Sequence, residues 1–252
     1  MEGRIFSGQC QRVFGSFVFW LCVVIFAALL VFNSTMTLVF GGDVLYAFDF
    51  ATLNLEALAL SILPSLPFAL SYYEEKRERS LRFSYIRSGT AEYITAKYLT
   101  VIFSGFLVVF LGFLLFTAVM SAFVPLYGEL SHGDEIGLKL LISRERYPEY
   151  IFLFSLCYGM SGALFSGITF LCSFFFRGSY TVMVMPYIGY RMMLFLKAVL
   201  KIPVDPRSWF IDFPKALTPA GTVLKKLVFV SVILLVIGFT AVWKAERSAL
   251  RD

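Results

Sequence analysis

Few side chains in this sequence belong to the types that catalyse reactions or hold metals. The one histidine, His132, lies in the polar stretch 131–135, so a zinc site of the His-Glu-x-x-His kind is excluded. The four cysteines lie mostly in apolar stretches, and no two form a Cys-x-x-Cys pair. A thiol in such a setting behaves as a small hydrophobic group. We therefore expect no disulfide and no metal site.

A nucleotide site of the P-loop kind is also missing from the sequence. The nearest approach to Gly-x-x-x-x-Gly-Lys-Ser/Thr is the pair Gly162 and Gly167, in an apolar stretch without a lysine. Residues 74–79 resemble the Glu-Glu-x-x-x-Arg motif of CAAX-type intramembrane proteases, but those enzymes also need membrane histidines, and His132 lies in a polar loop. We therefore expect no enzymatic activity and no cofactor on this chain itself.

The elements that position the remaining polar residues are apolar helices. Hydrophobic residues make up 59% of the 252 residues, and the mean hydropathy is +0.79, whereas globular proteins are roughly 45–50% apolar. The apolar runs are continuous rather than alternating, which favours helices of about 20 residues over β-strands. We predict an all-α integral membrane protein with six transmembrane helices, forming a single domain over residues 1–252. The predicted spans are residues 13–32, 53–72, 98–124, 150–176, 179–200 and 228–243.

Basic residues set the expected orientation, because they collect on the cytoplasmic side of a membrane. Twelve of the 22 lysines and arginines fall on the side that holds both termini and the loop between the second and third spans. Residues 33–52 carry none. We therefore expect a multi-pass protein of a bacterial cytoplasmic membrane with both termini in the cytoplasm. No Ala-x-Ala site follows residues 13–32, so we expect an uncleaved anchor.

Two charged residues lie inside predicted spans. A charged side chain in the membrane costs free energy, so each is a candidate functional residue. Glu56 lies about one turn inside the second span, where it either serves a translocation path or is tolerated near the outer interface. Arg191 either faces a polar central cavity near Glu56, or the fifth helix ends around Tyr190 and Arg191 begins a re-entrant segment. Pro186, just upstream, weakens that helix.

Small residues recur every fourth position along the fourth predicted span. A small-xxx-small stripe lets two helix backbones approach each other closely. We expect this stripe to be a helix-packing face, more often within the chain than between two chains. Its residues are Ser155, Gly159, Ala163 and Gly167.

The cytoplasmic segment 73–93 mixes charges of both signs at helical spacing. Gly89 can take the left-handed C-cap conformation at the end of a short helix, and Thr90 can cap a following helix that carries Glu92 in its first turn. The pattern predicts a short amphipathic helix, a sharp turn and then the third span. Such a corner presents a charged surface to a cytoplasmic partner, although a solvated loop that only sets the topology fits the same pattern.

This segment resembles the membrane subunits of ATP-binding cassette (ABC) transporters of the type-2 permease family. The likeness lies in Glu78-Arg79-Ser80-Leu81-Arg82-Phe83, in Arg87-Ser88-Gly89-Thr90 and in Ala96-Lys97-Tyr98, although the family's Gly-Thr before Leu81 is missing. The resemblance implies that the segment is a coupling helix docked on a separate ATPase subunit. The ATPase-coupling residues would be Glu78, Arg79, Leu81, Arg82 and Tyr85.

The resemblance also implies a dimer of permease chains, either identical or similar, that exports an amphipathic peptide, drug or lipid. ATP and magnesium would be bound by the partner subunit, and no nucleic acid is involved. The proline-rich stretch 201–222, with its rings Trp209, Phe210 and Phe213, is expected to form an interfacial or re-entrant segment before the last helix. It resembles the irregular and partly re-entrant helices that precede the last span in that family. An ion-coupled carrier, or an immunity-type membrane protein without transport, is the alternative. A carrier usually has several intramembrane acids and an internal repeat.

Overall fold

The structure is a computed structural model that describes residues 2–35, 42–54, 58–69, 71–77, 85, 89–128, 137–176, 178–200, 206–211 and 216–249. All regular secondary structure in these residues is helical. Four helices are long and apolar enough to cross a membrane, and a fifth candidate is a bent pair of helices. The chain is therefore an all-helical membrane protein. The four single helices are α8 (Thr90–Met120), α10 (Tyr147–Cys172), α11 (Ser179–Leu200) and α13 (Pro219–Ala249).

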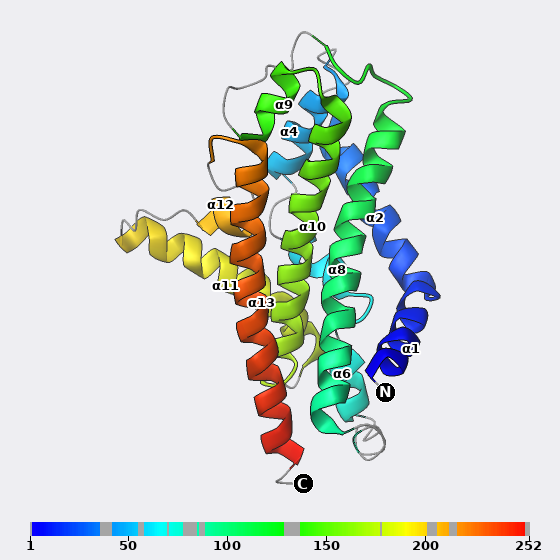
Figure 1. Cartoon of the computed structure of the whole chain (residues 1–252), viewed down its shortest axis with the longest axis vertical. Coiled ribbons are helices and arrows are strands. Elements are labelled where there is room, and N and C mark those ends of the chain that lie inside the picture. The colour runs from blue at the N-terminus through cyan, green and yellow to red at the C-terminus, as the bar shows by residue number, and fades with distance from the viewer. Residues whose placement is uncertain are drawn as a thin grey trace.

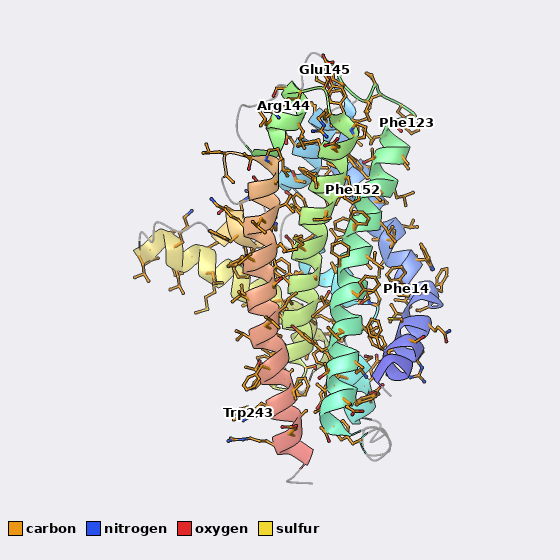
Figure 2. The ribbon with its side chains drawn as sticks, viewed as in Figure 1. Phe14, Phe123, Arg144, Glu145, Phe152 and Trp243 are labelled. Atoms are coloured by element: carbon orange, nitrogen blue, oxygen red, sulfur yellow. The ribbon has the colours of Figure 1, made fainter. Side chains whose placement is uncertain are left out.

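The bent pair consists of α1 (Glu2–Phe14) and α2 (Phe17–Asn33), with a 57° change of direction between them. The break has a local cause, because Ser16 caps α2 by accepting a hydrogen bond from the backbone N–H of Val18 at 3.2 Å. Our predicted span 13–32 placed Val13 in the same straight helix as α2. The helix of the span instead starts at Phe17. Phe14, labelled in Figure 2, packs the end of α1 onto α8 through Phe103, with ring centroids 5.9 Å apart.

The second predicted span, residues 53–72, is not one continuous helix in the described residues. The chain forms α4 (Val44–Asn54), α5 (Leu58–Ile62), the 3-10 turn η1 (Leu63–Ser65) and α6 (Ser71–Arg77). Pro64 falls at the start of η1, and Pro67 follows it. Because proline has no N–H and its ring clashes with the preceding turn, two prolines so close together interrupt an α-helix.

Most of α4 lies in residues 33–52, which connect the first and second predicted spans. Asp43 fastens the start of this helix, because its carboxylate accepts hydrogen bonds from the backbone N–H of Tyr46 at 2.7 Å and of Gly128 at 2.5 Å. Asp43 is 1% exposed, so its backbone donors replace water. This contact ties α4 to the chain that follows α8.

The core is built around α8 and α10, which lie side by side with α2 against α8 and α13 against both (Figure 1). Their close approach depends on glycine. A Cβ on Gly162 of α10 would lie 2.6 Å from the backbone oxygen of Gly105 on α8. Stacked and edge-on rings fill the adjacent space, with Phe48, Phe113 and Phe154 in mutual contact at 4.9 to 5.8 Å between centroids.

The helix predicted over residues 179–200 is confirmed, and α11 has these bounds. It leaves the bundle at a steep angle to α13 and projects outward (Figure 1). Only 17% of the residues in its most apolar stretch are buried, against 78% in α10. The remaining short helices are η2 (Gly137–Lys139), α9 (Leu140–Ser143) and α12 (Pro206–Phe210).

The two ends of the bundle differ in which segments they hold. Helices α4 and α9 lie at one end, while α6 and the last turns of α13 lie at the other, with α1 beside them (Figure 1). The end of α6 and the start of α8 therefore lie at the same end of the bundle as both terminal helices. This arrangement brings together the parts of the chain that we predicted to be cytoplasmic.

Candidate functional site

A buried ion pair lies where α6 meets the first turns of α8. Lys97 is 0% exposed, and its ammonium Nζ lies 2.5 Å from Oε2 of Glu75 on α6. Tyr93, one turn before Lys97, donates its hydroxyl to the same carboxylate oxygen at 2.6 Å. One carboxylate thus holds two donors from α8. Removing only one partner of such an ion pair leaves the other charge buried without compensation, which strongly destabilises the folded protein.

Aromatic rings enclose the ammonium group of Lys97. Its Nζ lies 5.6 Å from the ring centroid of Phe68 and 5.5 Å from that of Tyr93, within the distance at which a cation is attracted to a ring. The enclosure and the ion pair together hold α6 against α8. We call Glu75, Tyr93 and Lys97 the clamp.

The turn into α8 agrees with the prediction only in part. Gly89 has a φ of +80°, and Glu92 lies in the first turn of the helix. The cap differs by one residue, because α8 already begins at Thr90 and Gly89 occupies the N-cap position without a side-chain hydrogen bond. A residue with a Cβ would be strained at this φ. Gly89 therefore allows the chain to enter α8 through a backbone conformation that other residues rarely adopt.

Four of the predicted coupling residues, Glu78, Arg79, Leu81 and Arg82, lie outside the described residues. The fifth, Tyr85, is half-buried and turned toward the bundle. Its ring contacts that of Tyr93 at 6.0 Å between centroids, and burial raises the pKa of its hydroxyl. Tyr85 thus connects the predicted coupling segment to the clamp.

A second buried lysine lies toward the opposite end of the bundle. Lys226 of α13 is 0% exposed and donates to the backbone oxygen of Ile211, just after α12, at 2.7 Å. Ser161 of α10 donates to the same oxygen at 3.4 Å, and the ammonium lies 5.6 Å from the ring of Tyr158. Lys226 therefore holds the end of α12 against α10 and α13.

The two candidate translocation-path residues have different outcomes. Glu56 lies outside the described residues. Arg191 is exposed, and its guanidinium lies 5.9 Å from the ring of Tyr187, one turn earlier in α11. Helix α11 continues without a break to Leu200, so Arg191 lies within the helix and does not begin a separate segment. Pro186 is accommodated inside the helix.

The small-residue stripe on α10 lies on contacts within the chain. A Cβ on Gly159 would lie 2.8 Å from the ring of Phe106 on α8, and one on Gly167 would lie 2.8 Å from Leu234 on α13. Ser155 and Ala163, the other members of the stripe, are buried. The stripe therefore serves two neighbouring helices at different heights.

The predicted spans begin at residues 98 and 228, which leaves both buried lysines, Lys97 and Lys226, just outside them. The position of each lysine in its helix is the signal that indicates burial. Lys97 follows Tyr93 by one helical turn near the start of the long apolar helix α8. Lys226 lies about two turns inside α13. Their partners, Glu75 and the Ile211 carbonyl, are distant in sequence, and the spacing of residues does not reveal them.

Comparisons with models of known protein families, with curated proteins and with solved structures found no match.

Proposed function

We propose that this chain is the membrane-spanning permease subunit of an ABC transporter and that the segment 73–93 couples it to an ATPase subunit. The observation that carries the proposal is the clamp. A coupling element must transmit a push from a soluble motor to a membrane helix, and the Glu75–Lys97 pair links the start of this segment to α8. A loop that only sets topology needs no buried ion pair.

The proposed assembly contains two such chains, identical or similar, and two ATPase subunits at the cytoplasmic face. Each chain crosses the membrane six times, with the bent pair α1–α2 as the first crossing and the broken stretch of residues 53–72 as the second. ATP-driven closure of the ATPases moves the coupling segments and switches the permease between two states. The exported molecule is amphipathic, a peptide, drug or lipid, and passes between the two chains in a bacterial cytoplasmic membrane.

Copurification in mild detergent tests the proposal. The wild-type chain is expected to bring an ATPase subunit with it, and Arg79→Glu with Arg82→Glu to lose that subunit while the permease still inserts. Lys244→Glu with Arg247→Glu is the matched control. Both residues belong to the last turns of α13, at the same end of the bundle as α6, but they lie outside the segment 73–93. A wild-type chain that purifies alone and moves substrate on an ion gradient would make it a carrier instead.

A second variant separates docking from coupling. Replacing both clamp charges, Glu75→Gln with Lys97→Met, leaves no unpaired buried charge. This variant is expected to retain the ATPase subunit and to lose stimulation of ATP hydrolysis by substrate. Normal stimulation in this variant would show that the clamp transmits nothing.

A further inference from the structure

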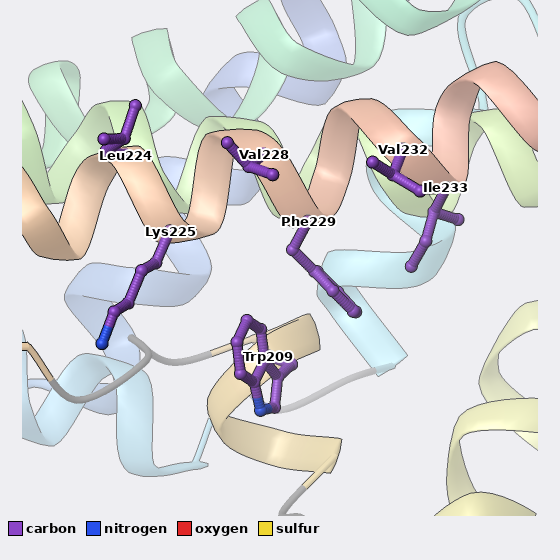
Figure 3. A pocket seen from close by; sticks show the side chains of 7 residues that line it. All are labelled: Trp209, Leu224, Lys225, Val228, Phe229, Val232 and Ile233. Carbon is purple, nitrogen blue, oxygen red and sulfur yellow. The ribbon is translucent and has the colours of Figure 1, made fainter.

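A pocket of about 540 Å³ lies between α12 and one face of α13 (Figure 3). Trp209 of α12 forms one wall, and its ring contacts that of Phe229 at 5.0 Å between centroids. Val228 and Val232 continue the α13 wall and are more than half exposed, so the pocket opens on the outside of the bundle. Lys225 is the charged residue in the lining. The volume lies within the range of about 300–1,000 Å³ typical of small-molecule sites.

The charges on α13 give the depth of this pocket in the membrane. Lys225 and Lys244 are 19 residues apart in one helix, which at 1.5 Å per residue is about 28 Å. This length matches a hydrocarbon core of about 30 Å. The residues from 227 to 243 carry no charge. Lys225 and Lys244 therefore lie at the headgroup levels of opposite leaflets.

The apolar part of the pocket extends from Lys225 toward the centre of the bilayer. Val232 lies seven residues further along α13, which is about 10 Å deeper. Trp209 lies across the pocket from Val228 and Phe229 in Figure 3. The site thus has a cation at the depth of the lipid headgroups and an apolar lining that extends from it toward the centre of the bilayer. This order of groups matches that of a phospholipid, with its phosphate above its acyl chains.

We propose that the pocket binds one acyl chain of an anionic phospholipid and that Lys225 attracts its headgroup. The cation selects an anionic over a zwitterionic headgroup, and the rings of Trp209 and Phe229 hold the chain. The inference needs only a membrane location for α13 and does not depend on the permease function. A chain without any transport activity would still bind lipid here.

Fluorescence quenching by brominated lipids tests this site directly. Trp20→Phe with Trp243→Phe leaves Trp209 as the only tryptophan of the full chain. The variant is reconstituted in mixed phosphatidylcholine and phosphatidylglycerol vesicles, with bromine on the acyl chains of one lipid or the other. Bromine on phosphatidylglycerol is expected to quench Trp209 with about fivefold higher apparent affinity, the factor equivalent to ~1 kcal/mol for one basic residue near anionic lipid.

Two pairs of further variants identify the groups responsible. Lys225→Gln is expected to abolish the preference, while Lys244→Gln, at the opposite headgroup level, preserves it. Val228→Phe fills the pocket and is expected to reduce quenching by both lipids. Val236→Phe, on the exposed face of α13 outside the pocket, leaves quenching unchanged.

The remaining outcomes overturn the proposal. Equal quenching by both lipids means that ordinary surrounding lipid fills the pocket without selection. No quenching by either lipid means that protein covers Trp209, from a second copy of the chain or another partner. A preference that survives Lys225→Gln places the anionic lipid elsewhere.

Discussion

Helices α10 and α11 follow each other in sequence and have similar lengths, yet the molecule uses them in opposite ways. The most apolar stretch of α10 has a mean hydropathy of 1.7 and is 78% buried, whereas that of α11 has a mean hydropathy of 1.3 and is 17% buried. Hydropathy alone does not account for this contrast. Side-chain size does, because glycines give α10 a surface that other helices can approach, while α11 presents large side chains such as Phe195 to its surroundings.

The contrast shows that an apolar run reports entry into a membrane but not the neighbours of the helix. The exposed face of α11 must meet lipid or another protein chain, since apolar side chains at this density are not left in water. Most of α10, in contrast, packs against other described parts of the chain. Substitutions at matched positions on the two helices therefore separate folding from assembly.

The largest expected effect comes from closing the contact between α8 and α10. In Gly162→Val, the new Cβ would lie 2.6 Å from the backbone oxygen of Gly105 and 2.6 Å from a methyl group of Val109. A backbone atom cannot rotate away, so the helices must separate, at an expected cost of about 3 kcal/mol in unfolding free energy. Thermal unfolding in detergent measures this loss.

Gly189→Val on α11 is the matched control. A Cβ at Gly189 meets nothing within 4 Å, so the melting temperature in detergent is expected to stay close to that of the wild type. If both variants melt alike, the close contact between α8 and α10 does not stabilise the fold.

Most of the long helices could be predicted from the sequence because an uncharged run of 20 or more residues has few alternatives in a membrane. The bounds of α11 agree with prediction, since Leu200 is followed closely by Lys201 and Pro203. The start of α13 does not agree. It begins at Pro219, nine residues before the predicted start at Val228, because Lys225 and Lys226 end the uncharged run on which the prediction rests.

The candidate site was less predictable than the helices. Lys226 is tolerated inside the bundle because the Ile211 carbonyl and the ring of Tyr158 replace its hydration. Lys97 is tolerated because Glu75 neutralises it. Both partners belong to segments that only tertiary folding brings close, and a charge in isolation predicts exposure. The clamp therefore had to be seen in three dimensions.

A smaller difference is expected between a cation that packs beside α10 and a cation on α11. Lys226→Met removes the shorter of two hydrogen bonds to the Ile211 carbonyl and should cost about 1.5–3 kcal/mol, the range for a hydrogen bond from a charged donor. Arg191→Met on α11 should change stability by less than about 0.5 kcal/mol, because the guanidinium is exposed. Denaturant titration of both variants in the same detergent gives the two values. Equal losses would mean that Lys226 contributes no more than an exposed cation.

The smallest effect on stability, and the most informative about assembly, concerns two exposed rings. Phe152 on α10 is 49% exposed and contacts Phe110 at 5.7 Å between ring centroids, whereas Phe195 on α11 is 67% exposed. Phe152→Ala should cost about 1 kcal/mol through the lost ring pair. Phe195→Ala should cost less than that, since the ring is more exposed.

The order should reverse when assembly in the membrane is measured. If the proposed permease forms a dimer, α11, which projects from the bundle, can reach a second chain (Figure 1). Phe195→Ala should then lower the dimer fraction, while Phe152→Ala leaves it unchanged, because exposed rings anchor interfaces when a partner covers them. Energy transfer between differently labelled chains in vesicles measures both fractions. An unchanged dimer fraction in Phe195→Ala would place this face of α11 against lipid, and the contrast between the two helices would then reflect burial within one chain alone.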